Sequence, residues 1–409
     1  MTSAPGTPPA GGSHGWNVVL CAVAYQGLSL GFLLYGTAVL VVPWSETFHA
    51  ARADVLLVTF ACQIATACYA PICGRLVDRV PIRRLVLIGL GLLGAGLALA
   101  SRAQSVWQIV LVYCLTIAPA SLLAGALTAM TLATRWFDER RGLAIGVVSL
   151  GSSVGGVIVP PLMTALATAH GWRVGLQWFA GATLLIFVPL VAAVLAREPP
   201  APAAHARAPA GAPAAHHGWT IPRILGTAGF WVPAVAIAVL TLASVGIQIN
   251  LVAHARDQQF SAARAALLLP VLSGAMAAGK ILCGALSDRI AHRTMYWLAG
   301  SVFICAMLVL LGSKSWLALM LGAALCGFAS GAVQPILGAT MAAQFGIAAF
   351  GQAVGLAYVV MNVSAFGPVF AGRIYDRTGS YDAAFATFAA LVAGAMLIMA
   401  RYRPRASAG

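Results

Sequence analysis

Twelve runs of about 18 or more mostly apolar residues follow one another along the chain, and each can cross a bilayer as a helix of about 20 residues. The runs cover approximately residues 17–42, 54–74, 85–101, 106–131, 142–165, 174–196, 227–252, 263–286, 294–312, 317–340, 352–372 and 384–401. Only 8% of the residues are charged and 61% are hydrophobic, whereas soluble domains have roughly 25% and 45–50%. We therefore expect an all-α membrane protein with twelve transmembrane helices.

The only long polar connection lies between the sixth and seventh runs, and it divides the chain into two halves. Its sequence, REPPAPAAHARAPAGAPAAHH, is rich in Ala and Pro and has no periodicity, which is typical of a linker without regular structure. The predicted organisation is a tail at 1–16, a six-helix bundle at 17–196, a linker at 197–225, a second six-helix bundle at 226–402 and a tail at 403–409.

The distribution of basic residues predicts how the chain is oriented. The even-numbered connections and the C-terminus carry 15 Lys and Arg residues, and the odd-numbered connections carry 8. By the positive-inside rule, both tails and the linker are expected on the cytoplasmic side of a cell (inner) membrane. The net charge of +14 is thus explained by topology, with no nucleic-acid partner. Residues 1–15 hold no Lys or Arg, so we expect the first run to remain as a span.

The connections after the second and eighth runs contain the same residues at a constant offset of 210. Gly74, Asp78, Arg79 and Arg83 recur as Gly284, Asp288, Arg289 and Arg293. A six-span unit duplicated in one orientation is typical of transporters whose halves rock around a site at the bilayer midplane. We expect the charged members of both copies to stabilise closure on the cytoplasmic side.

Two motifs resemble those of a known transporter family. The connection that begins at Gly74 is similar to the GxLxDRxGRR motif of the major facilitator superfamily, with Pro81 where a glycine is usual. The start of the fifth run resembles the signature YFxKRRxLAxGxAxxG of the monocarboxylate transporters, matching at Phe137, Arg140, Arg141, Leu143, Ala144, Gly146 and Gly151. Further stretches resemble bacterial members of that family and its oxalate:formate relatives. The resemblance implies two pseudo-symmetric six-helix bundles in a functional monomer.

Lys280 is the one basic residue that falls inside an apolar run. A charge near the bilayer centre costs about 2.5–3.5 kcal/mol on insertion scales and usually marks a substrate or ion path. All acidic residues map to connections or span ends, so a substrate carboxylate is the expected counter-charge. The alternative is a lysine that extends toward the cytoplasmic end, where Asp288 lies. In the monocarboxylate transporters, by resemblance, an Arg on span eight precedes a Gly by four residues, as Lys280 precedes Gly284.

Several polar residues in the runs could complete a pocket around Lys280. The candidates are Tyr35, Tyr113, Asn250, Tyr358 and Asn362, together with Gln248 and Gln334. Each could instead form hydrogen bonds between helices. His254 resembles a family region of the form HLVPxxRD and could titrate during transport, or it could be a solvated residue at the membrane surface.

The prediction is a secondary active transporter of small monocarboxylate anions, such as lactate or pyruvate, that works by alternating access in a lipid bilayer. Proton coupling is implied by the resemblance. The alternatives are an organic-anion exchanger, a drug antiporter, which would normally need an embedded carboxylate, and a membrane sensor for organic acids. No enzyme motif of the HExxH or GxSxG kind occurs, so neither a cofactor, a metal nor a catalytic residue is expected.

Overall fold

The computed structural model describes residues 13–137, 140–196, 219–261, 264–265, 267–311 and 315–401, and every regular element within these ranges is a helix. The first half contains α1 (Ser13–Gly31), η1 (Phe32–Gly36), α2 (Thr37–Phe48), α3 (Arg52–Arg79), α4 (Ile82–Ala100), α5 (Val106–Val112), η2 (Tyr113–Ile117), α6 (Ala118–Leu123), α7 (Ala126–Trp136), α8 (Arg141–His170), α9 (Trp172–Ala182), η3 (Thr183–Phe187) and α10 (Val188–Val194). The second half contains α11 (Ile221–Leu225), α12 (Ala228–Asp257), α14 (Leu268–Ser287), α15 (His292–Leu310), α16 (Trp316–Phe345), η5 (Ile347–Ala349), α17 (Phe350–Met361), η6 (Asn362–Ala365), α18 (Phe366–Thr378) and α19 (Asp382–Arg401).

These helices confirm the predicted membrane architecture. Among the described residues, 11 segments are long and apolar enough to cross a membrane. The first predicted span is helical as well, because α1, η1 and α2 follow one another without a break. Most of the predicted tails and residues 197–218 of the predicted linker lie outside the described residues, although α1 begins inside the predicted first tail, at Ser13.

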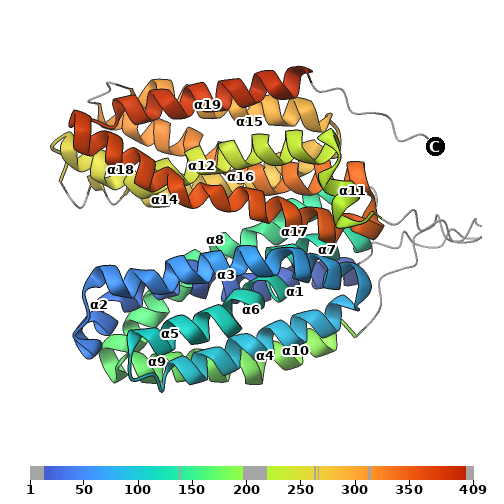
Figure 1. Cartoon of the computed structure of the whole chain (residues 1–409), viewed down its shortest axis with the longest axis vertical. Coiled ribbons are helices and arrows are strands. Elements are labelled where there is room, and N and C mark those ends of the chain that lie inside the picture. Colours follow the sequence, from blue (N-terminus) through green and yellow to red (C-terminus); the bar gives the residue numbers. More distant parts are fainter. Residues whose placement is uncertain are drawn as a thin grey trace, which may run out of the picture.

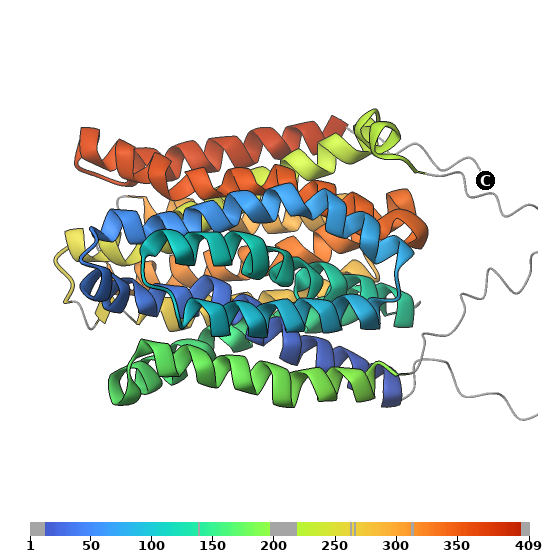
Figure 2. The same ribbon diagram turned by 60° about the horizontal axis from the view of Figure 1, so that its bottom comes forward.

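The two halves form two bundles that lie side by side, with the helices of both running along a common direction (Figures 1 and 2). One end of the molecule carries the beginning of α1, the end of α19 and the short helix α11, and we call it the terminus-bearing end (Figure 1). Two ring contacts lie at this end. The ring centres of His14 and Trp136 are 5.4 Å apart, and those of Trp219 and Phe345 are 4.9 Å apart. The hairpins that join α2 to α3 and α18 to α19 lie at the opposite end.

The last part of the predicted linker is folded rather than irregular. Pro222 occupies the first turn of α11, where its fixed φ angle suits a helix and its missing N–H costs nothing. The Trp219 ring packs edge-on against Phe345, and the Arg223 guanidinium lies 5.3 Å from the centre of the Trp219 ring. The Ala- and Pro-rich composition of the linker did not predict these contacts with the second bundle.

Two membrane-crossing segments are interrupted near the middle of the molecule. The predicted span 106–131 breaks at Ala124 and Gly125, where Gly125 is extended, with φ −135° and ψ −151°. In the other half, the 3-10 turn η6 separates α17 from α18. Such interruptions are tolerated at membrane depth where they line a cavity, because the backbone groups that they free must find polar partners.

The first bundle is held together by a close crossing of α1 and α8 at glycines. A Cβ atom placed on Gly31 would lie 2.7 Å from the Cα atom of Gly155, so there is no room for a side chain at either of these two positions. Small residues at such crossings let two membrane helices pack closely.

The Gly155→Ala variant is therefore expected to lower the stability of the fold by about 1–3 kcal/mol, because backbone atoms cannot move aside. Thermal unfolding in detergent measures this as a lower midpoint. The matched control is Gly181→Ala on α9, where a Cβ meets nothing within 4 Å, and helix propensity alone should raise its midpoint slightly. Equal midpoints for the two variants would contradict the packing argument.

Candidate functional site

A cavity of about 220 Å³ lies between the two halves. From the first half it is lined by Leu30, Leu33, Gln63, Thr66, Ala67, Ser121, Leu122, Ala126 and Leu127, and from the second half by Thr241, Gln334, Tyr358, Met361, Asn362 and Ser364. Both helix interruptions contribute to its wall. Ala126 and Leu127 begin α7, so the positive end of that helix dipole faces the cavity.

Lys280 lies on α14 and reaches across to the other half. Its side chain is buried, with 4% of its surface exposed. The ammonium donates to Oγ of Ser152 at 2.9 Å and to Oγ of Ser153 at 2.7 Å, both on α8. It forms no ion pair with a carboxylate of the described ranges. Lys280 therefore does not extend toward Asp288, and its charge is met only by two neutral hydroxyl groups.

Hydrogen bonds of two serines connect Lys280 to the wall of the cavity. The Ser152 hydroxyl, which accepts from Lys280, donates to the carbonyl oxygen of Ser149 at 3.2 Å. The Ser149 hydroxyl lies 3.4 Å from Oε1 of Gln334, and Gln334 lines the cavity from α16. The ammonium group is therefore connected to the cavity wall only through these residues.

Two predicted site residues, Tyr358 and Asn362, line this cavity directly, whereas Lys280 is not among its lining residues. The Tyr358 hydroxyl is 3.6 Å from Sδ of Met130, and Nδ2 of Asn362 is 3.4 Å from the carbonyl oxygen of Gln63. Both contacts reach from the second half to the first. The structure thus brings Tyr358 and Asn362 together with Gln334 on the second-half wall of the cavity.

Tyr113 and Tyr35 are not among the residues that line the cavity. Tyr113 is fully buried within the first bundle, where its hydroxyl lies 3.3 Å from that of Thr37 and its ring meets the edge of Trp44. Tyr35 is 37% exposed and packs beside Gly156 of α8. Their contacts are those of residues that join helices of one bundle.

Asn250 and His254 lie inside the second bundle, on α12. Asn250 donates to the carbonyl oxygens of Gly246 and Pro368, and its Oδ1 atom accepts from the Tyr381 hydroxyl at 3.3 Å. His254 is 4% exposed. Its ring stands edge-on to the rings of Tyr381 and Phe385, and its Nε2 atom is 3.0 Å from Nε2 of Gln258. His254 is thus buried rather than solvated, and it does not line the cavity.

The two repeated aspartates make equivalent contacts between the halves. The Asp78 carboxylate, at the end of α3, accepts from the backbone N–H groups of Gly351 and Gln352 in the first turn of α17, both at 2.8 Å. The Asp288 carboxylate accepts from the N–H groups of Gly142 and Leu143 in the first turn of α8, at 2.6 and 3.0 Å. The first turn of a helix has unpaired N–H groups and a partial positive charge, both of which favour a carboxylate.

Close helix crossings accompany these contacts. A Cβ atom on Gly284 would lie 2.9 Å from the Cα atom of Gly146, and one on Gly74 would lie 3.1 Å from the Cα atom of Gln352. The interface between the halves is therefore tightly closed toward the terminus-bearing end. The side chains of the four repeated arginines, in contrast, are exposed: Arg79, Arg83, Arg289 and Arg293.

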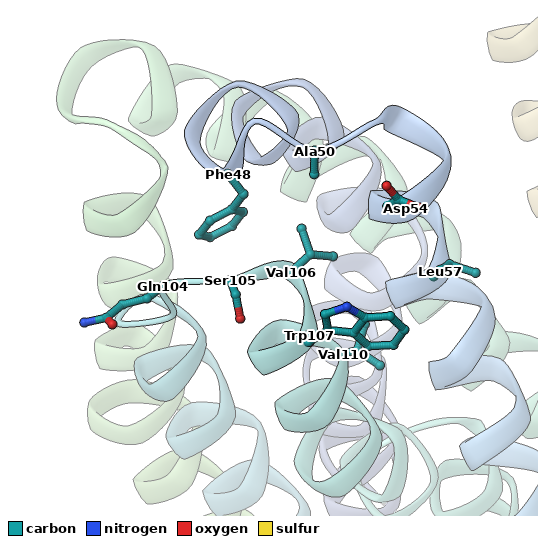
Figure 3. Close-up of a pocket in the computed structure, with 9 residues that line it drawn as sticks. All are labelled: Phe48, Ala50, Asp54, Leu57, Gln104, Ser105, Val106, Trp107 and Val110. Carbon is teal, nitrogen blue, oxygen red and sulfur yellow. The ribbon is translucent and has the colours of Figure 1, made fainter.

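A second pocket, of about 350 Å³, lies at the opposite end of the first bundle (Figure 3). It is lined by Phe48, Ala50, Asp54, Leu57, Gln104, Ser105, Val106, Trp107 and Val110. All of these residues belong to the first half, and the only charged one is the acidic Asp54. The Asp54 carboxylate would repel an anion. The lining of the cavity between the halves carries no charged residue and is linked by hydrogen bonds to the serine that holds Lys280, so this cavity is the better candidate.

The residues that hold Lys280 were not predicted from the sequence. Ser152 and Ser153 are two small uncharged residues within an apolar run, immediately after Gly151. Serine is common wherever membrane helices pack closely. Their position next to a glycine of the span-five signature was the only signal that could have drawn attention to them.

Comparison with known proteins agrees with this arrangement. The sequence model of the Major Facilitator Superfamily matches residues 23–313 and 234–409. The chain is 27% identical over 422 residues to monocarboxylate transporter 11 of Homo sapiens, covering 96% of this chain and 83% of that protein. It is also 27% identical over 403 residues to monocarboxylate transporter 13 of Bos taurus, covering 96% and 88%.

Among solved structures, the fucose:proton symporter FucP of E. coli superposes with a TM-score of 0.70 at 15% identity, covering 94% of this chain and 97% of that one. This likeness concerns the fold alone, and it agrees with the two helix bundles described above. From its sequence match and its architecture, the chain belongs to the Major Facilitator Superfamily of membrane transporters.

Proposed function

We propose that the protein transports small monocarboxylate anions by alternating access and binds the carboxylate at Lys280. The observation that carries this proposal is the buried ammonium of Lys280, which has two hydroxyl partners and no ion pair with a carboxylate among the described residues. A buried charge is stable only when it is paired and hydrogen-bonded. One cation and the positive end of α7 suit a monoanion. The chain's likeness to proteins named monocarboxylate transporters supports the same substrate class.

The position of Lys280 suggests how binding is linked to movement. Lys280 belongs to the second half, while Ser152 and Ser153 belong to the first, so their hydrogen bonds join the halves. A substrate carboxylate that enters the cavity competes with the two hydroxyls for the ammonium. An ionised acceptor forms hydrogen bonds roughly twice as strong as a neutral one. Substrate binding would thus weaken one contact between the halves and favour their rearrangement.

The aspartate contacts would control access from the terminus-bearing end. Because connections at this end are the ones rich in Arg, we assign it to the cytoplasmic side. The structure then corresponds to a state closed toward the cytoplasm, with Asp78 and Asp288 each holding the first turn of a helix in the other half. Opening toward the cytoplasm requires that both carboxylates release these N–H groups.

The proposal is tested with purified protein in proteoliposomes. We expect labelled lactate to accumulate when the external medium is more acidic than the lumen, because a symported proton would drive the acid inward. A protonophore should abolish the accumulation. Uptake that depends on an internal organic acid and ignores the pH gradient would indicate an exchanger instead. Binding of lactate without any flux would indicate a sensor and overturn the proposal.

A further inference from the structure

Gln26, in the middle of α1, is fully buried, and its amide group has no partner. Its relative exposure is 0%, and within the described residues neither its Nε2 nor its Oε1 atom forms a hydrogen bond. A buried polar group left unpaired costs about 1–3 kcal/mol, so an unpaired amide calls for an explanation. One explanation is that the amide forms hydrogen bonds only when a ligand is bound, and the position of Gln26 supports it.

Gln26 lies on the face of α1 that borders the cavity. Leu30 of α1 and Leu33 of η1 line the cavity and follow Gln26 by four and seven residues, which places Gln26 on the helix face that they share, although Gln26 itself is not among the lining residues. The neighbours of Gln26 in sequence face other helices: the Tyr25 hydroxyl contacts Thr128 on α7, and Gly27 packs on α8. The side chain of Gln26 lies between these contacts, with its Cβ and Cγ atoms beside Gly151 of α8.

A second unpaired polar group lies on the same face of α1. Ser29 follows Gln26 by three residues, is 1% exposed, and its hydroxyl also has no partner among the residues described. Two buried polar groups without partners, one turn apart on a cavity-facing helix, form a local site that is incomplete by itself. Together they offer three donor hydrogens and two acceptor oxygens to a ligand.

Gln26 also lies at the level of Lys280 along the membrane axis. A Cβ atom on Gly151 would be 3.0 Å from Cβ and 3.2 Å from Cγ of Gln26. The residue after Gly151 is Ser152, whose hydroxyl accepts from the Lys280 ammonium at 2.9 Å. The amide and the ammonium are thus placed at neighbouring positions of α8, from α1 on one side and α14 on the other.

We propose that Gln26, assisted by Ser29, is the residue that recognises a polar substituent beside the carboxylate of the substrate. This inference rests on the proposed function, in which Lys280 binds the carboxylate. The amide N–H group can donate to a 2-oxo oxygen, and the amide oxygen can accept from a 2-hydroxyl group. An unsubstituted acid would leave the amide unpaired, and a site that retains an unpaired polar group discriminates against such a substrate.

The test compares lactate with propionate, which has the same carbon chain but no 2-hydroxyl group. In Gln26→Leu proteoliposomes, the ratio of lactate to propionate uptake should fall about tenfold, because one hydrogen bond to lactate is lost and propionate loses nothing. Thermal stability should be unchanged or higher, since an unpaired buried amide has been removed. Ser29→Ala should lower the ratio in the same direction, and it tests the site with a minimal change should Gln26→Leu fold poorly.

The matched control is Thr340→Val on α16. Thr340 is 5% exposed and also has an unpaired hydroxyl in the part of the chain described, but it lies on α16, six residues beyond Gln334, which is the residue of that helix that lines the cavity. Its variant should leave the uptake ratio unchanged. Equal losses of lactate and propionate uptake in Gln26→Leu would show a structural role and overturn this inference alone. Failure of the unmodified protein to transport either acid would overturn the proposed function and this inference with it.

Discussion

Replacing Lys280 with glutamine is expected to lower lactate uptake in proteoliposomes about thirtyfold or more. Removing one partner of a buried charge pair costs about 2–5 kcal/mol, and every 1.4 kcal/mol corresponds to a factor of ten. The variant should still fold, because a glutamine amide can donate to Ser152 and Ser153 and no buried charge remains to be desolvated. The measurement is the initial rate of labelled lactate uptake, together with the lactate-induced shift in thermal unfolding.

The control for this prediction is Lys280→Arg, which keeps the charge. Arginine is larger and presents its donors in a planar fork, so partial uptake with altered selectivity among acids is expected. A folded Lys280→Gln protein that takes up lactate at the original rate would show that the carboxylate binds elsewhere. The same rate loss in Lys280→Gln and Lys280→Arg, with both proteins folded, would show that size rather than charge matters at this position.

Replacing both Asp78 and Asp288 with asparagine is expected to open the terminus-bearing end. Each carboxylate accepts two N–H groups from the other half, and hydrogen bonds to a charged group contribute about 1.5–3 kcal/mol. Asparagine retains the shape and loses the charge. In hydrogen exchange measured by mass spectrometry, the first turns of α8 and α17 should exchange about tenfold faster or more.

Asp54→Asn is the matched control for this second prediction. Asp54 is an exposed acid in the first turn of α3, at the opposite end of the molecule, and its variant should leave the exchange of α8 and α17 unchanged. Unchanged exchange in the double variant would refute the role of the two carboxylates in closing this end. A single variant should produce a smaller effect than the double variant, because the two contacts are separate in space.

The repeat shows which features of the interface between the halves can be predicted from the sequence. The constant offset of 210 showed that Asp78 and Asp288 are equivalent, and that both lie just beyond a membrane span. The sequence did not show that each carboxylate caps a helix in the opposite half, nor that the four arginines would point outward. Capping depends on which helix of the other bundle begins beside the carboxylate, and that is a property of the assembled halves.

The candidate site shows the same division. Lys280 could be predicted because a charge in an apolar run is conspicuous, and Tyr358 and Asn362 were among the polar residues that could face a pocket. Tyr113, Asn250 and His254 were equally plausible by composition, yet they lie within single bundles. Almost nothing in the sequence pattern distinguished three further residues, Gln26, Ser152 and Ser153, from other polar residues in membrane helices. A polar residue in a membrane helix faces either a neighbouring helix or the cavity, and helix rotation decides between them.

The sequence by itself determined the helical membrane architecture, the division into two related halves, and the position of Lys280 inside an apolar span. These follow from the length and polarity of local segments, since each span must satisfy its own backbone in the bilayer. Only the tertiary structure decided which hydroxyls hold Lys280, where two spans break beside the cavity, and which helix starts the two repeated carboxylates contact. The physical reason is that these features depend on how helices far apart in the sequence rotate and pack against each other. Helix packing in lipid is set by the shapes of the helix surfaces and by hydrogen bonds between them, and the length of an apolar segment specifies neither.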